Sequence, residues 1–213
     1  MMLSYTLAQF ITMVEADSPI PGGGSVCAWV AALGTALSRM YQNLSFGRKK
    51  YESLSCDEKK SFEANFCRLQ SLQEQLLTYI EKDALAYESL LKAYRLSKNT
   101  TAETEFRKAA IFQATDLAIE SPLTIMKLAV EALSLLNEIV DQGNDKAISD
   151  VAVAAILLAA AVEGAALNVL INLGQLDSET REGYKAEIAV LKEQASNYKD
   201  SVVIQVEIKL QAK

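Results

Sequence analysis

The sequence of 213 residues carries a formal net charge of −6, and half of its residues are hydrophobic. This content is ample for a core, and because no basic stripe with interleaved aromatic residues is present, we expect no nucleic-acid partner. The chain contains no histidine, which removes the usual acid–base group of neutral pH and the commonest metal ligand. Any catalysis must therefore use carboxylate, amine, amide, hydroxyl or thiol groups, and we expect no metal site.

The small numbers of glycines and prolines, 9 and 3, indicate a single helical domain over residues 1–213. Apolar residues recur every three or four positions, which predicts an all-α fold, a multihelical bundle of long helices. The predicted ranges are 4–15, 25–44, 57–96, 101–120, 123–140, 151–173 and 178–213, with fraying beyond Val202. The expected N-caps are Ser4, Ser25, Thr101 and either Ser149 or Asp150. Pro122 either kinks its helix or begins another.

The cysteine content and the N-terminal sequence favour a cytoplasmic protein. Cys27, Cys56 and Cys67 are odd in number and lack metal-ligand spacing, which is typical of free thiols in the cytosol. No basic region followed by an apolar core and a cleavage site begins the chain, so we expect no export signal. The two most apolar runs, Val26–Leu37 and Val151–Val162, contain 12 residues each, whereas a spanning helix needs roughly 20. We therefore expect buried core helices and no membrane.

A loop rich in proline and glycine, Ser18–Ser25, precedes the first long predicted helix. Its prolines end the preceding structure, while Gly22, Gly23 and Gly24 let the backbone turn and approach another molecule closely. With Ser25 as the N-cap, the unpaired N–H groups and the helix dipole would favour a negative ligand group. The alternative is a turn that serves packing alone, because neither a Walker loop nor a dinucleotide fingerprint is present.

A basic turn follows that helix near Gly47 and presents Arg48, Lys49 and Lys50. The charge pattern favours a solvated turn that supports the helix C-terminus. The alternative is a cluster that binds carboxylate or phosphate near the ligand loop.

Asp83 interrupts the apolar stripe of the predicted helix 57–96. The stripe comprises Phe62, Phe66, Leu69, Leu72, Leu76, Ile80, Tyr87, Leu90 and Tyr94. Burial raises the pKa of a carboxyl group by disfavouring its charged form. A carboxyl group tuned toward neutral pH suits general acid–base catalysis in a chain without histidine. The alternative is a structural Asp83 held by an arginine or by backbone donors.

Two amides share a face of the most apolar predicted helix, because Asn168 and Asn172 follow Gly164 at four-residue steps. A buried amide without partners costs about 1–3 kcal/mol. The pair therefore indicates either a ligand-binding surface or a hydrogen-bond pair between helices, and the sequence does not separate the two.

An ordered set of landmarks resembles the cyclodeaminase/cyclohydrolase family of folate one-carbon metabolism. They are Pro21–Ser25, Asn43-Leu44, Gly47–Tyr51, Asp83, Pro122, Gly143-Asn144, Ser149-Asp150, Asn168-Val169 and Ile171–Leu173. The resemblance implies a fold of long helices that forms an intimate homodimer, with the folate site in a cleft near the dimer interface. Cys27-Ala28-Trp29 departs from the small aliphatic residues that the family usually has there.

The resemblance implies a formiminotetrahydrofolate cyclodeaminase, which forms 5,10-methenyltetrahydrofolate and ammonia. The alternatives are methenyltetrahydrofolate cyclohydrolase and a non-catalytic helical binding module. We expect Asp83 to shuttle protons and Arg48 and Lys49 to hold the carboxylates of the glutamate tail. The remaining expected substrate-binding residues are Gly22, Gly23, Gly24, Ser25, Asn144, Asp150, Asn168 and Asn172. No cofactor beyond the tetrahydrofolate substrate is expected, and a separate formiminotransferase is an expected partner.

Overall fold

The computed structural model describes residues 2–212, which form seven α-helices and no strand. The helices are α1 Leu7–Val14, α2 Gly23–Asn43, α3 Lys49–Glu52, α4 Cys56–Tyr94, α5 Thr101–Ile139, α6 Ile148–Asn172 and α7 Ser178–Gln211. Three short 3-10 turns join them, η1 Met2–Ser4, η2 Asp145–Ala147 and η3 Leu173–Gln175. The predicted all-α fold of long helices is confirmed.

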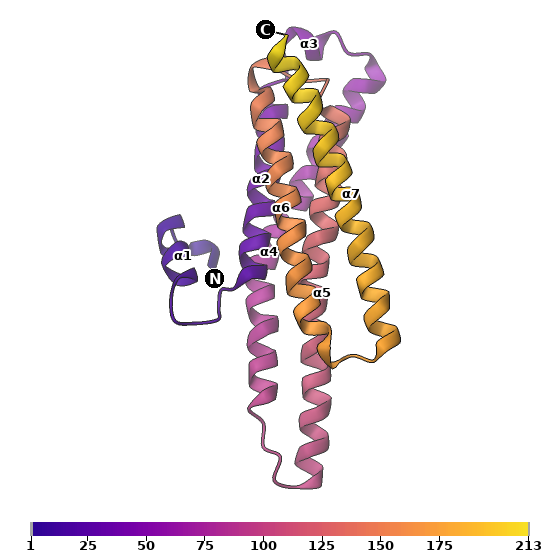
Figure 1. The fold of residues 1–213 in the computed structure, drawn as a ribbon. Coiled ribbons are helices and arrows are strands. Elements are labelled where there is room, and N and C mark those ends of the chain that lie inside the picture. Colours follow the sequence, from indigo (N-terminus) through magenta and orange to yellow (C-terminus); the bar gives the residue numbers. More distant parts are fainter. Residues whose placement is uncertain (1, 213) are drawn as a thin grey trace.

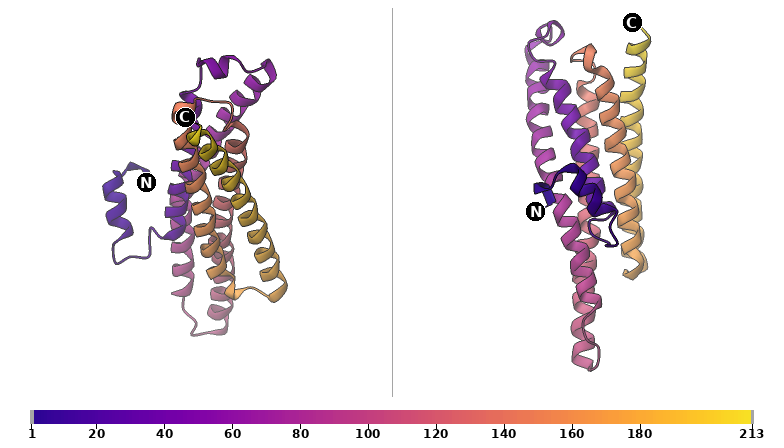
Figure 2. Two further views of the ribbon diagram at one scale, coloured as in Figure 1. Left: turned by 45° about the horizontal axis from the view of Figure 1, so that its top comes forward. Right: turned by 90° about the vertical axis from the view of Figure 1, so that its left-hand side faces the viewer.

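The five long helices lie side by side as an elongated bundle (Figure 1). α4 and α5 have 39 residues each and form an antiparallel hairpin whose tip extends beyond the other helices (Figure 2). α5 contacts α2, α4, α6 and α7, so the apolar side chains of its second half form the centre of the core. Leu123, Met126, Leu133 and Leu136 there are all but inaccessible to solvent.

Two helix starts differ from their predicted caps by one or two residues. Thr6, rather than Ser4, caps α1, and Thr100, rather than Thr101, caps α5. In both cases the threonine hydroxyl accepts from the third residue of the helix, whose own side chain bonds the cap backbone in return. This reciprocal capping box satisfies two donors at once and therefore fixes where the helix begins.

Of the two effects predicted for Pro122, the start of a new helix is wrong, since α5 runs without interruption from Thr101 to Ile139. A kink stays a prediction. Proline removes one N–H donor from the helix ladder and leaves the carbonyl four residues earlier, that of Ala118, without its helical partner. Pro122 is buried, and packing on neighbouring helices keeps this part of α5 helical.

The predicted fraying beyond Val202 is also wrong, since α7 is helical to Gln211. Val202 and Val206 are buried against the bundle. Lys209 also holds the end of α7 on the bundle, because its ammonium donates to the Val140 carbonyl at 3.2 Å. Lys213, at the end of the predicted range, lies outside the described residues.

Within residues 2–212, α6 with the turn before it, Asp145–Asn172, is the one helical stretch long and apolar enough to cross a membrane. Half of its most apolar window is buried inside the bundle. The prediction of a buried core helix therefore holds for only part of α6. Ser149 and Asp150, predicted to open this helix, lie within its first turn.

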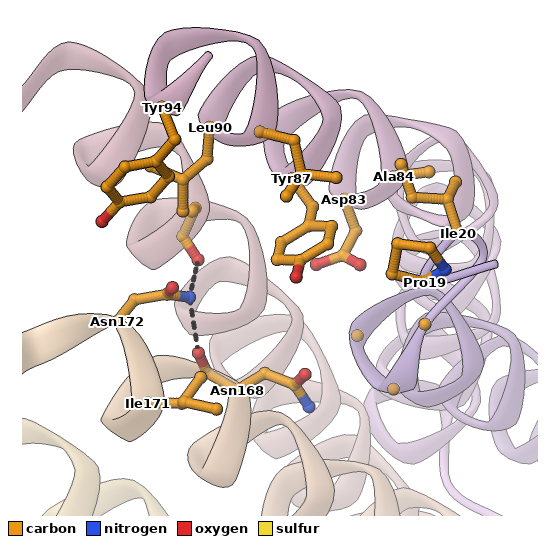
Figure 3. A pocket seen from close by; sticks show the side chains of 15 residues that line it. Pro19, Ile20, Asp83, Ala84, Tyr87, Leu90, Tyr94, Asn168, Ile171 and Asn172 are labelled. Atoms are coloured by element: carbon orange, nitrogen blue, oxygen red, sulfur yellow. Dashed lines mark hydrogen bonds between the residues drawn. The ribbon is translucent and has the colours of Figure 1, made fainter. Parts of the chain in front are cut away.

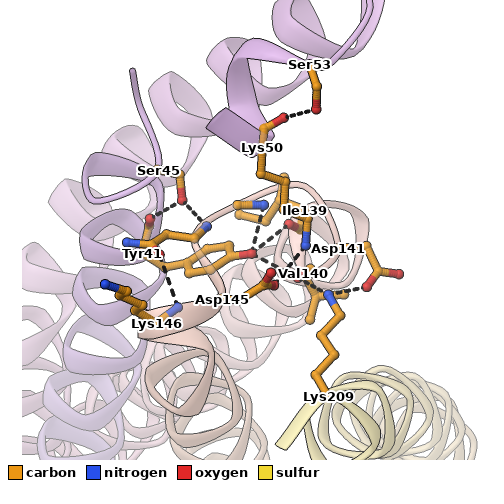
Figure 4. Close-up of polar contacts among 12 residues, drawn as sticks. Tyr41, Ser45, Lys50, Ser53, Ile139, Val140, Asp141, Asp145, Lys146 and Lys209 are labelled. Carbon is orange, nitrogen blue, oxygen red and sulfur yellow. Dashed lines mark hydrogen bonds and ion pairs between the residues drawn. The ribbon is translucent and has the colours of Figure 1, made fainter. Parts of the chain in front are cut away.

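A buried tyrosine fixes the connection between α5 and α6 at the end of the bundle (Figure 4). The Tyr41 hydroxyl donates to the Val140 carbonyl and accepts from the Gly143 N–H, both at 2.9 Å. Ser45 donates to the Tyr41 carbonyl at 2.7 Å and accepts from the Asn144 N–H at 2.8 Å. These bonds hold the connection against α2.

We predict that Gly143→Ala lowers the free energy of unfolding by about 1–3 kcal/mol, as overpacking does. A Cβ atom at Gly143 would lie 2.4 Å from Ser45 Oγ and 2.5 Å from Tyr41 Cζ, and both neighbours are buried. Gly183→Ala in α7 is the matched control, because its Cβ would meet nothing within 4 Å. Urea unfolding measures both variants. Equal stability of the two would contradict the role given to the Gly143 contact.

Candidate functional site

A cavity of about 400 Å³ opens where α2 begins and α6 ends, beside the C-terminal part of α4 (Figure 3). Its lining includes the predicted Gly22, Gly23, Gly24, Asp83, Asn168 and Asn172. The structure therefore brings together residues from three distant parts of the sequence. The remaining lining residues are Pro19, Ile20, Ala84, Tyr87, Leu90, Leu91, Tyr94, Ala118 and Ile171.

Asp83 lies between the cavity and two serine hydroxyls. Ser25 donates to one carboxylate oxygen at 3.2 Å, and Ser121 donates to the other at 3.4 Å. The Ser25 backbone N–H also lowers the pKa of the carboxyl group. Burial raises the pKa of Asp83, and the bonds from Ser25 and Ser121 lower it by a smaller amount. The group therefore holds a proton more readily than an exposed carboxyl does, as general acid–base chemistry requires.

The carboxylate of Asp83 also completes the start of α2. The helix begins at Gly23 with Gly22 as its N-cap, and the cap has no side-chain hydrogen bond. Ser25, predicted to be the cap, lies in the first turn and is buried. Its N–H is one of the donors that a helix start leaves unpaired, and a negative group there is favourable. The protein's own Asp83 therefore takes the place of the negative group that the sequence led us to expect from a ligand.

Gly24 is required by this arrangement. A Cβ atom at that position would lie 2.2 Å from Asp83 Oδ1 and 2.5 Å from its carboxyl carbon. The carboxylate packs directly on the backbone of the glycine loop, which no larger residue allows. The loop thus serves the close approach of α4, and the same approach places Asp83 at the cavity.

Asn172 supplies the hydrogen-bond donor that Pro122 removes from α5. Its amide nitrogen donates to the Ala118 carbonyl at 3.1 Å and to the Asn168 carbonyl at 2.9 Å. Ala118 is the residue whose carbonyl loses its helical donor to the proline. Asn172 therefore has the structural role of joining α6 to α5, and it lines the cavity at the same time.

A main-chain carbonyl also orients the amide of Asn168. Its nitrogen donates to the Gly164 carbonyl at 2.9 Å, and its side chain lies against Gly23, whose Cβ would come within 3.1 Å of it. Because carbonyls can only accept, the amide nitrogens of Asn168 and Asn172 face the main chain. Their oxygens remain as acceptors, so the polar wall of the cavity is suited to N–H donors on a ligand.

Aromatic residues of α4 form the other wall. Tyr87, Leu90 and Tyr94 extend from α4 beside Asp83 (Figure 3). The sequence pattern placed Tyr87 and Tyr94 on the apolar stripe and missed them as site residues. Their type was a usable signal, because a tyrosine has an apolar ring and a polar hydroxyl and therefore suits the wall of a cavity. Ser121 was also missed, because the adjacent Pro122 marked only a break in the helix.

Five predicted residues do not line this cavity. Of these, Ser25 is fully buried and bonds the Asp83 carboxylate, and the other four lie elsewhere. Arg48 and Lys49 lie beyond the far end of α2, which at 21 residues is roughly 30 Å long. Asn144 and Asp150 lie at the same end, at the start of α6. Asn144 donates to the Leu44 carbonyl at 3.1 Å and accepts from the Lys146 N–H. Within one chain these residues form a separate group.

Comparison with known proteins gives a consistent result. Residues 6–190 match the family model described as formiminotransferase-cyclodeaminase. The chain is 34% identical to the methenyltetrahydrofolate cyclohydrolase of Methylorubrum extorquens, over 88% of this chain and 92% of that protein. It is 33% identical to the formimidoyltransferase-cyclodeaminase of Rattus norvegicus, over 91% of this chain but only 35% of that protein.

A solved structure shares the fold over nearly the whole chain. The formiminotetrahydrofolate cyclodeaminase of Thermotoga maritima superposes with a TM-score of 0.84 at 26% identity. The superposition covers 97% of this chain and 98% of that one. The chain thus matches two relatives over more than nine-tenths of their length and spans about a third of the rat protein.

We predict that Asp83 makes the folded state less stable as pH rises. Because its pKa is raised above the ordinary value of 3.8, the folded state binds a proton more readily than the unfolded state. The free energy of unfolding of the wild type should therefore fall relative to that of Asp83→Asn as pH rises from below 3.8 through the raised pKa. Urea unfolding at several pH values measures the difference.

Asp177→Asn is the control for this measurement, with the opposite sign. The backbone N–H of Thr180 lowers the pKa of Asp177 at the start of α7. The wild type should therefore gain stability relative to Asp177→Asn as pH rises through the lowered pKa to its ordinary value. If the change of stability with pH had the same sign for both residues, burial would not control the pKa of Asp83.

Proposed function

Because this chain belongs to the formiminotransferase-cyclodeaminase family, we propose that it is a formiminotetrahydrofolate cyclodeaminase. The reaction converts 5-formiminotetrahydrofolate to 5,10-methenyltetrahydrofolate and releases ammonia. The observation that carries this proposal is Asp83, a carboxyl group with a raised pKa that two hydroxyls orient at the edge of the cavity.

The chemistry needs a group that takes and returns protons. The second bridging nitrogen attacks the formimino carbon, and a tetrahedral intermediate forms. This nitrogen must lose a proton, while the leaving nitrogen must gain one before ammonia departs. Asp83 as carboxylate takes the first proton and as carboxylic acid supplies the second. One C–N bond forms, one breaks and no carbon changes its oxidation state, so the proposed reaction needs no cofactor beyond the folate substrate.

The cavity walls suit the rest of a reduced folate. The pterin ring presents N–H donors at its edges, and the oxygens of Asn168 and Asn172 are the acceptors left at the polar wall. Tyr87 and Tyr94 supply flat surfaces on the opposite wall. The N–H groups of Gly23 and Gly24 lie at the start of α2, where a helix has no internal partners for them. These groups would hold the ring while Asp83 meets the one-carbon bridge.

A second candidate reaction is the hydrolysis of 5,10-methenyltetrahydrofolate to 10-formyltetrahydrofolate. The relative from M. extorquens, which matches over 92% of its own length, is named a cyclohydrolase. In that reaction water attacks the same carbon, and Asp83 would take its proton. A non-catalytic binding module is the third alternative. It accounts for the contact of Asp83 with the start of α2, but it needs no proton-transfer group at the cavity.

We further propose a homodimer formed through the outer sides of α2 and α6. Both helices pack on α5 with their inner sides, so their outer sides form one continuous face. Large apolar side chains are exposed along it, including Leu33 at 45%, Ile156 at 50% and Leu167 at 67%. Exposed apolar surface of this extent marks an interaction site. Ile171, 80% exposed, belongs both to this face and to the cavity lining, so a second copy would help to close the cavity.

The N-terminal arm supports the same proposal. α1 stands away from the bundle next to α2 (Figure 2), and an apolar groove of about 280 Å³ separates them. Leu7 and Ile11 of α1 line this groove and are more than half exposed. The ring of Phe10 packs at a tilt against Trp29, with the ring centroids 5.8 Å apart. A second copy would cover this groove as it covers the adjoining face.

A two-fold dimer of this kind would also explain the separate group of predicted residues. If the long helices of the two copies run in opposite directions, the Arg48 end of one copy lies beside the cavity of the other. Arg48 and Lys49 would then reach the glutamate tail of a folate bound by the second copy. We propose that the enzyme acts in the cytoplasm and receives its formimino substrate from a separate formiminotransferase.

We predict that Asp83→Asn lowers kcat by about 10²–10⁴-fold, the usual worth of a general acid–base group. Ammonia release from 5-formiminotetrahydrofolate and loss of the methenyl chromophore from 5,10-methenyltetrahydrofolate measure the two candidate reactions. Asp57→Asn, at an exposed position of α4, should keep wild-type turnover. Near wild-type activity of a folded Asp83→Asn protein would refute the assignment. If neither substrate turns over but both bind, the binding module is favoured.

We predict that Leu33→Glu combined with Ile156→Glu converts the dimer to a monomer of 23.3 kDa. Two buried charges at an apolar interface are unfavourable without partners. Light scattering after gel filtration measures the mass. Val190→Glu, at an exposed apolar position of α7, is the matched control and should remain dimeric. A monomeric wild type, or a dimeric double variant, would exclude this face as the interface.

A further inference from the structure

Ser121 connects the site to a second cavity. The residue lies in the middle of α5, is 6% exposed, and donates to Asp83 at 3.4 Å. It also lines a cavity of about 330 Å³ that does not include Asp83. The other lining residues are Tyr79, Lys82, Leu85, Ala86, Ser89, Leu117, Glu120 and Thr124.

The two cavities lie on different sides of the contact between α4 and α5. On α4, Asp83 and Tyr87 line the first cavity, whereas Lys82 and Ser89 line the second. Only one hydroxyl lies between them, since Ser121 lines the second cavity and touches the carboxyl group of the first. Water in the second cavity can therefore approach Asp83 from behind.

We propose that Ser121 relays protons between Asp83 and water in the second cavity. This inference rests on the proposed function. A folate in the first cavity covers Asp83 from that side, yet both candidate reactions exchange protons with water. Hydrolysis of the cationic methenyl bridge releases one proton. Formation of the methenyl cation and ammonium from a neutral formimino group takes up two.

The transfer needs only a hydroxyl that donates and accepts together. For release, the proton of the Asp83 carboxylic acid passes to Ser121 Oγ as the hydroxyl's own proton passes to a water. Ser121 is then neutral again, Asp83 is a carboxylate, and hydronium leaves through the second cavity. Proton uptake follows the same path in reverse.

The other groups around Asp83 offer no equivalent route. Ser25 of α2 also donates to Asp83, but it is fully buried and lines neither cavity. From α2, Cys27 is buried, and burial followed by the charge of Asp83 raises the pKa of its thiol to about 11. From α4, Tyr87 faces the first cavity, where the substrate binds. α6 contributes the amide of Asn168, which does not titrate. Lys82 of α4 and Glu120 of α5 line the second cavity, at the outer end of the proposed route.

The first test compares Ser121→Ala with Ser121→Thr in the full-length enzyme. Alanine removes the relay, so kcat should fall about tenfold while KM stays within twofold, because Asp83 remains and only its proton exchange slows. The solvent isotope effect on kcat should rise. Threonine keeps the hydroxyl and should restore most of the turnover. Wild-type kcat in Ser121→Ala would overturn the proposal.

The second test separates a relay from a purely positioning role of Ser121. Ser89→Leu narrows the second cavity but leaves the bond from Ser121 to Asp83 intact, whereas Ser89→Ala removes the same hydroxyl without narrowing the space. A relay predicts lower kcat for Ser89→Leu alone. Equal activity of the two Ser89 variants would show that Ser121 only orients Asp83, and the relay would be rejected.

A third measurement does not depend on turnover. Carbon-13 NMR of the aspartate carboxyl groups gives the titration of Asp83 without substrate. Loss of a donor to the carboxylate should shift its pKa upward in Ser121→Ala and leave it unchanged in Ser89→Ala. An unchanged titration in Ser121→Ala would show that the hydroxyl does not contact Asp83, even if the proposed reaction were wrong.

Discussion

The carboxylate of Asp83 at the first turn of α2 is the contact on which the site depends. It supplies the negative group that the start of a helix favours, and it draws α4 against a loop of glycines. The close approach leaves no room for a side chain at Gly24. The same contact buries the carboxyl group beside an open cavity. Burial raises its pKa, and the bonds from Ser25 at the helix start lower it by a smaller amount.

Pro122 has consequences on both sides of α5. It leaves the Ala118 carbonyl without its helical donor, and Asn172 of α6 supplies one at 3.1 Å. One turn of α5 thus ties α6 to the cavity and, through Ser121, provides a hydroxyl to Asp83. Asn172 fits both interpretations of the amide pair, a hydrogen bond between helices and a ligand-binding surface. Its nitrogen joins α6 to α5, and its oxygen is available as an acceptor at the cavity.

One face of α6 is packed in the core and the other is exposed. Its inner face is packed among α2, α5 and α7, and its outer face continues the exposed apolar surface of α2. An apolar helix that is only half buried is unusual for a chain that acts alone. The proposed dimer accounts for this surface and for the position of Arg48, which one chain leaves remote from the cavity.

The sequence by itself determined the helical class, the approximate helices and the site candidates Asp83, Asn168, Asn172 and the glycine loop. These follow from local patterns, namely a period of 3.6 residues and polar groups where that period requires apolar ones. The sequence did not determine the helix ends as closely. Thr6 and Thr100, rather than neighbouring residues, are the N-caps because each forms a capping box.

Only the tertiary structure decided which of these residues meet. Arg48 and Asp83 both follow from sequence landmarks, but the rigid length of α2 keeps them apart within one chain. Ser121 and Asp83 are 38 positions apart, and no periodicity connects them. Their contact exists because α4 and α5 pack in one particular register, and a packing register is a property of the assembled helices rather than of any single segment.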